Sequence, residues 1–199
     1  MGMKGPVPRR LVLASASPRR SELLSSAGFD VIIRPSSVVE LTEGLSPRDL
    51  VLANAEMKAL SVAAATTGDL VLGADTIVVL DGEILGKPRD LTHAAQMLSQ
   101  LSGRVHEVLT GVCMLRGGSV ARCSFVESTQ VAFRPLDPLM IAAYLAEIDP
   151  LDKAGAYAAQ EDRGRLIERI EGSMENVIGL PVARVLEAMA THFAEQPAG

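Results

Sequence analysis

Hydroxyl and guanidinium groups gather near the start of the chain, in Ser15-Ala16-Ser17-Pro18-Arg19-Arg20. Residues 11–14 suit a short buried strand, Ser17 is a good helix N-cap, and proline suits the first helical position. A helix N-terminus already carries partial positive charge, so Arg19 and Arg20 are mildly unfavourable there without an anion. The segment therefore predicts a phosphate site built from backbone N–H groups, Ser15, Ser17 and both arginines. The alternative is a solvated turn with two ordinary surface arginines.

A carboxylate interrupts the most apolar run of the chain, residues 70–80, at Asp75. The β-branched content and length of this run favour a strand buried on both faces. Burial of a lone carboxylate is costly unless it is paired, hydrogen-bonded or bound to a cation. Asp75 is therefore either part of a structural network or placed for chemistry, and we favour chemistry.

The chain turns back after this strand at Asp81-Gly82, which is typical of a tight hairpin turn. Residues 83–88 then return toward the same end of the sheet, which would bring Lys87 near the strand that carries Asp75. The segment from Gly82 to Lys87 is not a P-loop, because its spacing is one residue short and Pro88 replaces the metal-binding Ser or Thr.

Small residues dominate a second informative segment, residues 152–160, in which Asp152, Lys153 and Gln160 supply the polar groups. Small residues allow close approach of a backbone or ligand, so we interpret the segment as one wall of a ligand cleft. The alternative is a tight turn with a local ion pair. For Lys58, on a predicted helix, a solvated surface position is the default interpretation.

Composition limits the possible functions. The 199 residues suit one compact domain (1–199, core about 11–194) or two small lobes, and the net charge of -5 with a pI near 5.3 argues against a nucleic-acid or membrane-surface binder. No segment reaches the ~20 apolar residues of a membrane span, and the N-terminus lacks a signal-peptide pattern, so we expect a cytoplasmic protein. We also expect Cys113 and Cys123 to be free thiols, and His106 to be a structural hydrogen-bonding group rather than a zinc ligand.

The pattern of apolar residues and turn signals predicts a single α/β unit, built as one body or as two lobes, with the candidate residues lining a central cleft. On the helix that begins at Ser46-Pro47, a stripe of Leu50, Ala53, Met57 and Leu60 is expected to face the core. The predicted strands are 11–14, 29–34, 70–80, 105–116, 120–134 and 166–170, and the predicted helices are one from 18 to near 28, one from 46, 92–101, one from 137 and 181–193.

The chain resembles the Maf family of nucleoside triphosphate pyrophosphatases over about residues 11–186. The matching motifs are Ser15-Ala16-Ser17-Pro18-Arg19-Arg20, Gly73-Ala74-Asp75-Thr76, Gly86-Lys87-Pro88, Ser102-Gly103 with His106 and Thr110-Gly111, Asp152-Lys153-Ala154-Gly155-Ala156-Tyr157, and Asn176-Val177-Ile178-Gly179-Leu180-Pro181. The resemblance implies a mixed central sheet flanked by helices, similar to inosine triphosphatases, with a nucleotide cleft. It also implies hydrolysis of a nucleoside triphosphate to the monophosphate and pyrophosphate, a divalent cation (Mg²⁺ or Mn²⁺), and a homodimer.

Within the family, Gln160 after the Asp-Lys-Ala-Gly-Ala-Tyr motif is similar to the branch that acts on dTTP and UTP. The resemblance implies that Asp75 is the proton acceptor and that Glu40 and Asp75 bind the metal. It implies substrate contacts by the following residues: Ser15, Ser17, Arg19, Arg20, Lys58, Thr76, Lys87, Lys153 and Gln160. Two positions depart from the family pattern, because Val39 replaces an acid and Glu161 replaces a glycine.

Two other functions remain open at this point. Members of the family have been linked to arrest of septum formation, so a nucleotide-binding regulator of cell division is one alternative. A hydrolase for non-canonical purine or methylated nucleoside triphosphates is another, because the amide of Gln160 can pair with either class of base.

Overall fold

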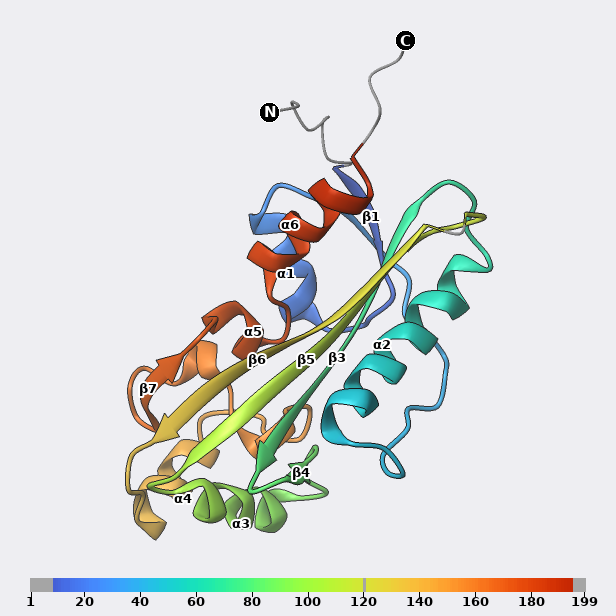
Figure 1. The fold of residues 1–199 in the computed structure, drawn as a ribbon. Helices are drawn as coiled ribbons and strands as arrows, with labels where there is room; N and C mark the ends of the chain where they lie inside the picture. Colours follow the sequence, from blue (N-terminus) through green and yellow to red (C-terminus); the bar gives the residue numbers. More distant parts are fainter. Residues whose placement is uncertain (1–8, 120, 195–199) are drawn as a thin grey trace. The chain divides into compact units, whose positions relative to one another are not determined.

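The computed structural model describes residues 9–119 and 121–194, and Figure 1 shows their helices and strands. A seven-stranded sheet has the order β2-β1-β3-β5-β6-β7, with β4 paired to β3. Strand β1 is parallel to β2 and β3, whereas β4 is antiparallel to β3 and β7 to β6. The mixed α/β class predicted from the sequence is therefore confirmed.

The strands and helices follow the predicted order closely. The strands are β1 (Arg10–Leu13), β2 (Asp30–Ile33), β3 (Leu70–Leu80), β4 (Glu83–Leu85), β5 (Val105–Arg116), β6 (Arg122–Phe133) and β7 (Ile167–Glu171). The helices are α1 (Pro18–Ser26), α2 (Pro47–Ala63), α3 (Leu91–Leu101), α4 (Pro138–Leu145), α5 (Met174–Ile178) and α6 (Val182–His192), with short 3-10 helices η1 (Ala154–Ala156) and η2 (Ala159–Glu161). Helix α5 was not predicted, because five residues are too few to show a helical period.

The chain forms two compact units. The first comprises the chain up to Asp75, residues 110–126 and the chain from Gly179 onward, and the second comprises residues 76–109 and 127–178. Strands β3, β5 and β6 each contribute residues to both units. The single functional domain over residues 1–199 and its central cleft stay predictions.

In the first unit the central strands β1 and β3 are buried on both faces. Alternate residues of a strand point to opposite faces, and two separate apolar clusters follow this alternation. Leu11, Leu13, Leu70 and Leu72 belong to the cluster that includes α1 and α6, as Val185 does. The other cluster contains the residues next to these in the chain, which point to the opposite face, together with residues of α2. Its members include Val12, Ala14, Val71, Ala55, Ala59, Val62 and Ala63. Helix α2 therefore covers one face of this part of the sheet, and α1 and α6 cover the other (Figure 1).

The predicted core stripe of α2 is wrong. Ala53 and Met57 are only half-buried and Leu60 is exposed, although Leu50 is buried as expected. The buried face is instead rotated around the helix, and its members are Leu50, Val51, Asn54, Ala55, Lys58, Ala59, Val62 and Ala63. Apolar residues occur all around α2, so the helical period alone could not identify the buried face.

The second unit has a core of its own, in which α3 and α4 pack with the strands and with the segment 154–159. His106, Phe133 and Tyr157 form an edge-to-face aromatic cluster within it. His106 Nε2 lies 2.9 Å from the Tyr157 hydroxyl, which confirms the structural role predicted for this histidine. At the tip of the β3–β4 hairpin Asp81 and Gly82 have φ of 51° and 86°, as a primed two-residue turn requires.

No helix in the described ranges is long and apolar enough to cross a membrane.

Candidate active site

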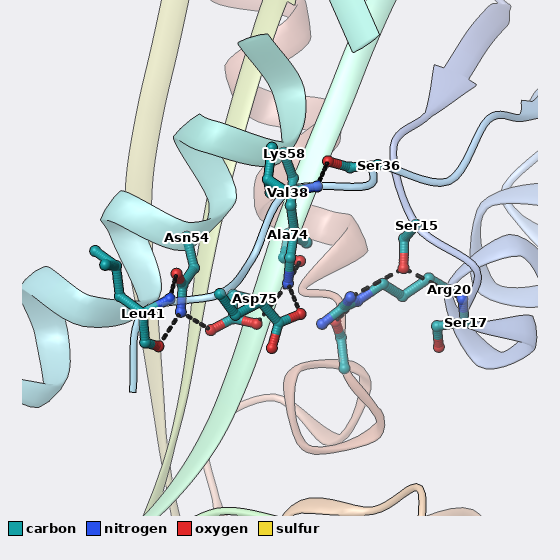
Figure 2. A network of polar contacts seen from close by, with 12 residues as sticks. Ser15, Ser17, Arg20, Ser36, Val38, Leu41, Asn54, Lys58, Ala74 and Asp75 are labelled. Atoms are coloured by element: carbon teal, nitrogen blue, oxygen red, sulfur yellow. Dashed lines mark hydrogen bonds and ion pairs between the residues drawn. The ribbon is translucent and has the colours of Figure 1, made fainter. Parts of the chain in front are cut away.

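Asp75 lies on the face of β3 that α2 covers. Every second residue of a strand points to the same face, and Val71 and Gly73, four and two residues before Asp75, pack against α2. The side chain of Asp75 therefore also faces α2, and the residue is only 8% exposed. Its carboxylate accepts a hydrogen bond at each oxygen, from Lys58 Nζ to Oδ1 at 2.7 Å and from Asn54 Nδ2 to Oδ2 at 3.1 Å (Figure 2). The charge that the apolar strand must accommodate is therefore paired and hydrogen-bonded.

Lys58 and Asn54 both reach Asp75 because they stand four residues apart on α2, one turn of the helix. The default interpretation of Lys58 as a solvated residue is wrong, because its side chain is only 10% exposed. Sequence reasoning missed Asn54 altogether. The signal that could have found it is the spacing of four residues from Lys58, combined with an amide in an otherwise apolar stretch.

A second carboxylate approaches the same ammonium group. Glu40 Oε1 lies 2.6 Å from Lys58 Nζ, although the Glu40 side chain is 48% exposed and its segment between β2 and α2 has no regular secondary structure. Asn54 also bonds the backbone of Leu41, the residue after Glu40. The structure thus brings together Glu40, Lys58 and Asp75.

Close packing of α2 on β3 depends on Gly73. A Cβ atom at this position would lie 2.3 Å from the carbonyl oxygen of Ala55 and 2.7 Å from the nitrogen of Ala59. Gly111 on β5 makes the same kind of approach, since its Cβ would lie 2.2 Å from the carbonyl oxygen of Val51. The glycines let the helix backbone lie directly on the strands, which is what allows α2 side chains to reach Asp75.

The predicted phosphate segment contains a network of its own, centred on Arg20 (Figure 2). Ser15 Oγ accepts hydrogen bonds from Ser17 N at 3.2 Å and from Arg20 Nη1 at 3.1 Å, and Arg20 Nε donates to the Gly179 carbonyl at 2.9 Å. Burial lowers the pKa of the Arg20 guanidinium, while the negative charges of Asp75 and Glu40 oppose that shift. Arg20 is therefore a buried, anchored cation rather than an ordinary surface arginine.

Arg19 and Ser17 differ from Arg20 in their surroundings, since both are only half-buried. Ser17 is the N-cap residue of α1, as predicted, but its side chain makes no capping hydrogen bond. The hydroxyl of Ser17 is thus not committed to the helix N-terminus.

The remaining predicted site residues belong to the second unit. Thr76 follows Asp75 on β3 and is half-buried, whereas Lys87 and Gln160 are exposed. The Gly155 N–H donates to the Gly86 carbonyl at 3.1 Å, so the segment that carries Lys87 lies beside η1.

Lys153 forms a local ion pair, as expected under the second interpretation of residues 152–160, a tight turn. Its Nζ lies 2.6 Å from the Asp149 carbonyl and 2.7 Å from Asp152 Oδ1, and the residue is 8% exposed. A role in substrate binding remains a prediction for this lysine.

A family model described as Maf-like protein matches residues 10–192. The chain belongs to the Maf family. A dTTP/UTP pyrophosphatase of an Anaeromyxobacter species is 50% identical over 184 residues, which cover 90% of this chain and 88% of that protein. A dTTP/UTP pyrophosphatase of Pyrococcus abyssi is 42% identical over 187 residues, which cover 94% and 98%.

Among solved structures, the Maf chain is similar to a nucleoside-triphosphatase, described as a dITP/XTP pyrophosphatase, from Mycobacterium abscessus. The TM-score is 0.44 at 15% identity, and the match covers 92% of this chain and 96% of that one.

Glu40 and Asp75 of this Maf protein supply carboxylate oxygens, the donor atoms that a hard divalent cation prefers. Both carboxylates contact Lys58 Nζ, at 2.6 and 2.7 Å, so the ammonium group occupies the position between them and a cation shared by the two would have to displace it. Mg²⁺ prefers oxygen ligands and is commonly held by one or two carboxylates together with substrate phosphates. In residues 9–119 and 121–194 no group of three or more His, Cys, Asp or Glu side chains is placed to hold a metal, so Glu40 and Asp75 would need ligands from substrate or water.

Proposed function

We propose that this Maf protein hydrolyses dTTP and UTP to the monophosphate and pyrophosphate. Relatives that are 42% and 50% identical over most of their length carry this activity in their names. The observation that carries the proposal is the buried Asp75 carboxylate, which is held by two donors beside a second carboxylate.

In the proposed reaction, Asp75 positions a water molecule and accepts its proton. Each carboxylate oxygen accepts one hydrogen bond from the protein, so each retains a lone pair for water. The water oxygen attacks the α-phosphorus in line with the bond to the bridging oxygen, and that bond breaks. The bridging oxygen keeps the electron pair and leaves as part of pyrophosphate.

Cations of the chain would offset the charge of the triphosphate. On the first unit we assign this role to Arg19, Arg20 and Lys58, with Ser15 and Ser17 as hydroxyl contacts. On the second unit we assign substrate contacts to Thr76, Lys87, Lys153 and Gln160.

We assign the metal to Glu40 and Asp75, because carboxylate oxygens are the ligands that a hard divalent cation prefers. A bound Mg²⁺ or Mn²⁺ would polarise phosphoryl oxygens and stabilise the charge that develops on them. We also propose that the protein is a cytoplasmic homodimer.

Base selection is assigned to Gln160, because its amide offers a donor and an acceptor together. Thymine and uracil present an acceptor, an N–H donor and an acceptor along one edge, whereas cytosine presents an amino donor and an acceptor nitrogen. A site built for the former leaves polar atoms unpaired against cytosine. Glu161 in place of a glycine causes no backbone strain, because its φ is not positive.

A nucleotide panel tests the proposal. Pyrophosphate release is measured with dTTP, UTP, CTP, ATP, GTP, dITP, XTP and 7-methyl-GTP, each with Mg²⁺ and with Mn²⁺. We expect kcat/KM for dTTP and UTP to exceed that for CTP by at least about tenfold. Comparable values for UTP and CTP would overturn the base recognition, and nucleotide binding without any pyrophosphate release would favour a regulatory protein.

The same panel with Asp75→Asn tests the role of the carboxylate. We expect kcat to fall by roughly 10²–10⁴-fold, the usual contribution of a general base. Because Lys58 and Asn54 both donate to Asp75, the new amide NH₂ group must face a donor, so a lower Tm is also expected. A folded Asp75→Asn protein with full activity contradicts the mechanism.

A further inference from the structure

Asn54 is a buried amide that contacts two different segments of the first unit. It is 2% exposed on α2. Its Oδ1 accepts a hydrogen bond from the Leu41 N–H at 2.8 Å, and its Nδ2 donates to the Leu41 carbonyl at 3.0 Å. The same Nδ2 donates to Asp75 Oδ2 at 3.1 Å (Figure 2).

The surroundings of this side chain require an amide in one orientation. With the amide reversed, its NH₂ group would face the Leu41 N–H, and its oxygen would face both the Leu41 carbonyl and the Asp75 carboxylate. An aspartate would keep the contact with the Leu41 N–H, but its second oxygen would face two other acceptors, the Leu41 carbonyl and the Asp75 carboxylate. A leucine would leave buried polar groups of Leu41 and Asp75 without this partner.

Packing alone does little to hold the segment that Asn54 binds. Leu41 is 40% exposed, and residues 34–46 contain no helix or strand. Glu40 lies in this segment and reaches Lys58 Nζ at 2.6 Å, the same atom that contacts Asp75 Oδ1. The hydrogen bonds to Leu41 thus fix the backbone beside Glu40 to the helix that carries Lys58.

We propose that Asn54 is a positioning residue that couples Glu40 to Asp75. Through Leu41 it fixes the backbone beside Glu40, and through its second N–H it fixes the orientation of the Asp75 carboxylate, so that both carboxylates meet at Lys58. The effect on rate rests on the proposed pyrophosphatase function, whereas the effect on the backbone of Leu41 does not.

The test combines kinetics with hydrogen exchange at one amide. In Asn54→Leu, whose side chain has a similar volume, we expect the Leu41 N–H to exchange at least about tenfold faster, because it loses its acceptor. We expect kcat with dTTP and UTP to fall roughly 10- to 100-fold, the loss that corresponds to a hydrogen bond to a charged group. KM should change less, because the substrate contacts are assigned to other side chains.

Ser61→Ala is the matched control. Ser61 is on the same helix and bonds Ser36 in the same segment, with 2.8 Å between the hydroxyl oxygens, but it has no contact with Asp75. We expect this variant to keep the wild-type kcat and the wild-type exchange rate of the Leu41 amide. A loss of kcat equal to that of Asn54→Leu would show that loosening the segment at any point is sufficient, and would overturn the specific role of Asn54.

Asn54→Asp keeps the acceptor for the Leu41 N–H and removes only the donor. In Asn54→Asp we expect the Leu41 amide to exchange more slowly than in Asn54→Leu, and kcat to be lower than in the wild type. If Asn54→Leu does not fold, Asn54→Asp tests the role of Asn54 by itself. A folded Asn54→Leu or Asn54→Asp protein with wild-type kcat overturns the proposal. If the wild type releases no pyrophosphate, the proposed function fails, and the exchange rate of the Leu41 amide still decides whether Asn54 holds this segment.

Discussion

Arg20 is buried and bonded to Ser15 and Gly179, whereas Arg19, the residue before it, is half-buried. Successive helical residues point about 100° apart, so adjacent arginines at the start of α1 face different surroundings. Both arginines are assigned to the triphosphate, but Arg20 also has a structural role in the first unit. Arg20 anchors the first turn of α1, and Arg19 is the cation with more access to solvent.

This difference predicts that alanine substitution at Arg19 mainly affects kinetics, whereas alanine substitution at Arg20 mainly affects stability. Arg19→Ala should lower kcat/KM for dTTP and UTP by roughly one to two decades with little change in Tm, because it removes a charge-assisted substrate contact. Arg20→Ala should lower the free energy of unfolding by about 1–3 kcal/mol, because Ser15 and Gly179 lose a buried partner. Thermal unfolding and steady-state kinetics on both variants check this. A drop in Tm for Arg19→Ala with unchanged kinetics would contradict the assignment.

At the scale of elements, the contact of α2 with β3 sets the geometry at Asp75. The helix backbone lies against Gly73 and supplies Asn54 and Lys58 from successive turns. The distance between helix and strand is therefore a requirement for both stability and the carboxylate contacts.

Gly73→Ala should lower both stability and activity. The added Cβ would lie 2.3 Å from the Ala55 carbonyl oxygen, which is backbone and cannot rotate away. We expect a loss of roughly 1–3 kcal/mol in the free energy of unfolding, together with a lower kcat, because α2 must move away from Asp75. Denaturant unfolding and kinetics measure the two effects.

Gly86→Ala is the control for this substitution. A Cβ at Gly86 meets no atom within 4 Å, and the residue does not have a positive φ. Its stability should stay close to that of the wild type. Equal losses of stability in Gly73→Ala and Gly86→Ala would show that the close approach of α2 to β3 does not explain the effect.

For the whole molecule, the buried His106 predicts loss of stability in mild acid. Burial lowers the pKa of His106 from 6.5 to about 4, so the folded chain stays neutral at this residue while the unfolded chain takes up a proton. Between these two values the unfolded state binds more protons, and the free energy of unfolding therefore falls as the pH falls. His106 should contribute on the order of 3 kcal/mol to this change.

Denaturant unfolding at several pH values between 4 and 7 measures this effect. His106→Gln keeps a polar atom near the Tyr157 hydroxyl but cannot take up the proton, so its pH dependence should be weaker. His192→Asn, at the exposed end of α6, should keep the wild-type dependence. An unchanged pH dependence in His106→Gln would show that other groups cause it.

Local signals in the sequence determined most of the elements and the position of the key carboxylate. Asp81-Gly82 forms the expected turn, and Asp137 caps α4 through its side chain, because both depend only on a few neighbouring residues. Asp75 could be identified because a carboxylate inside an apolar strand must have a partner wherever that strand lies. These features follow from backbone geometry and the cost of burial, which act at short range.

The tertiary structure alone decided which partners these residues have. The buried face of α2 depends on the strand opposite it, and Asn54 and Lys58 are buried because Asp75 on β3 offers them a carboxylate. Gly73 matters only because a helix that starts 26 residues earlier in the chain packs against it. Contacts between residues distant in sequence depend on how the elements pack, and no pattern within a single segment contains that information.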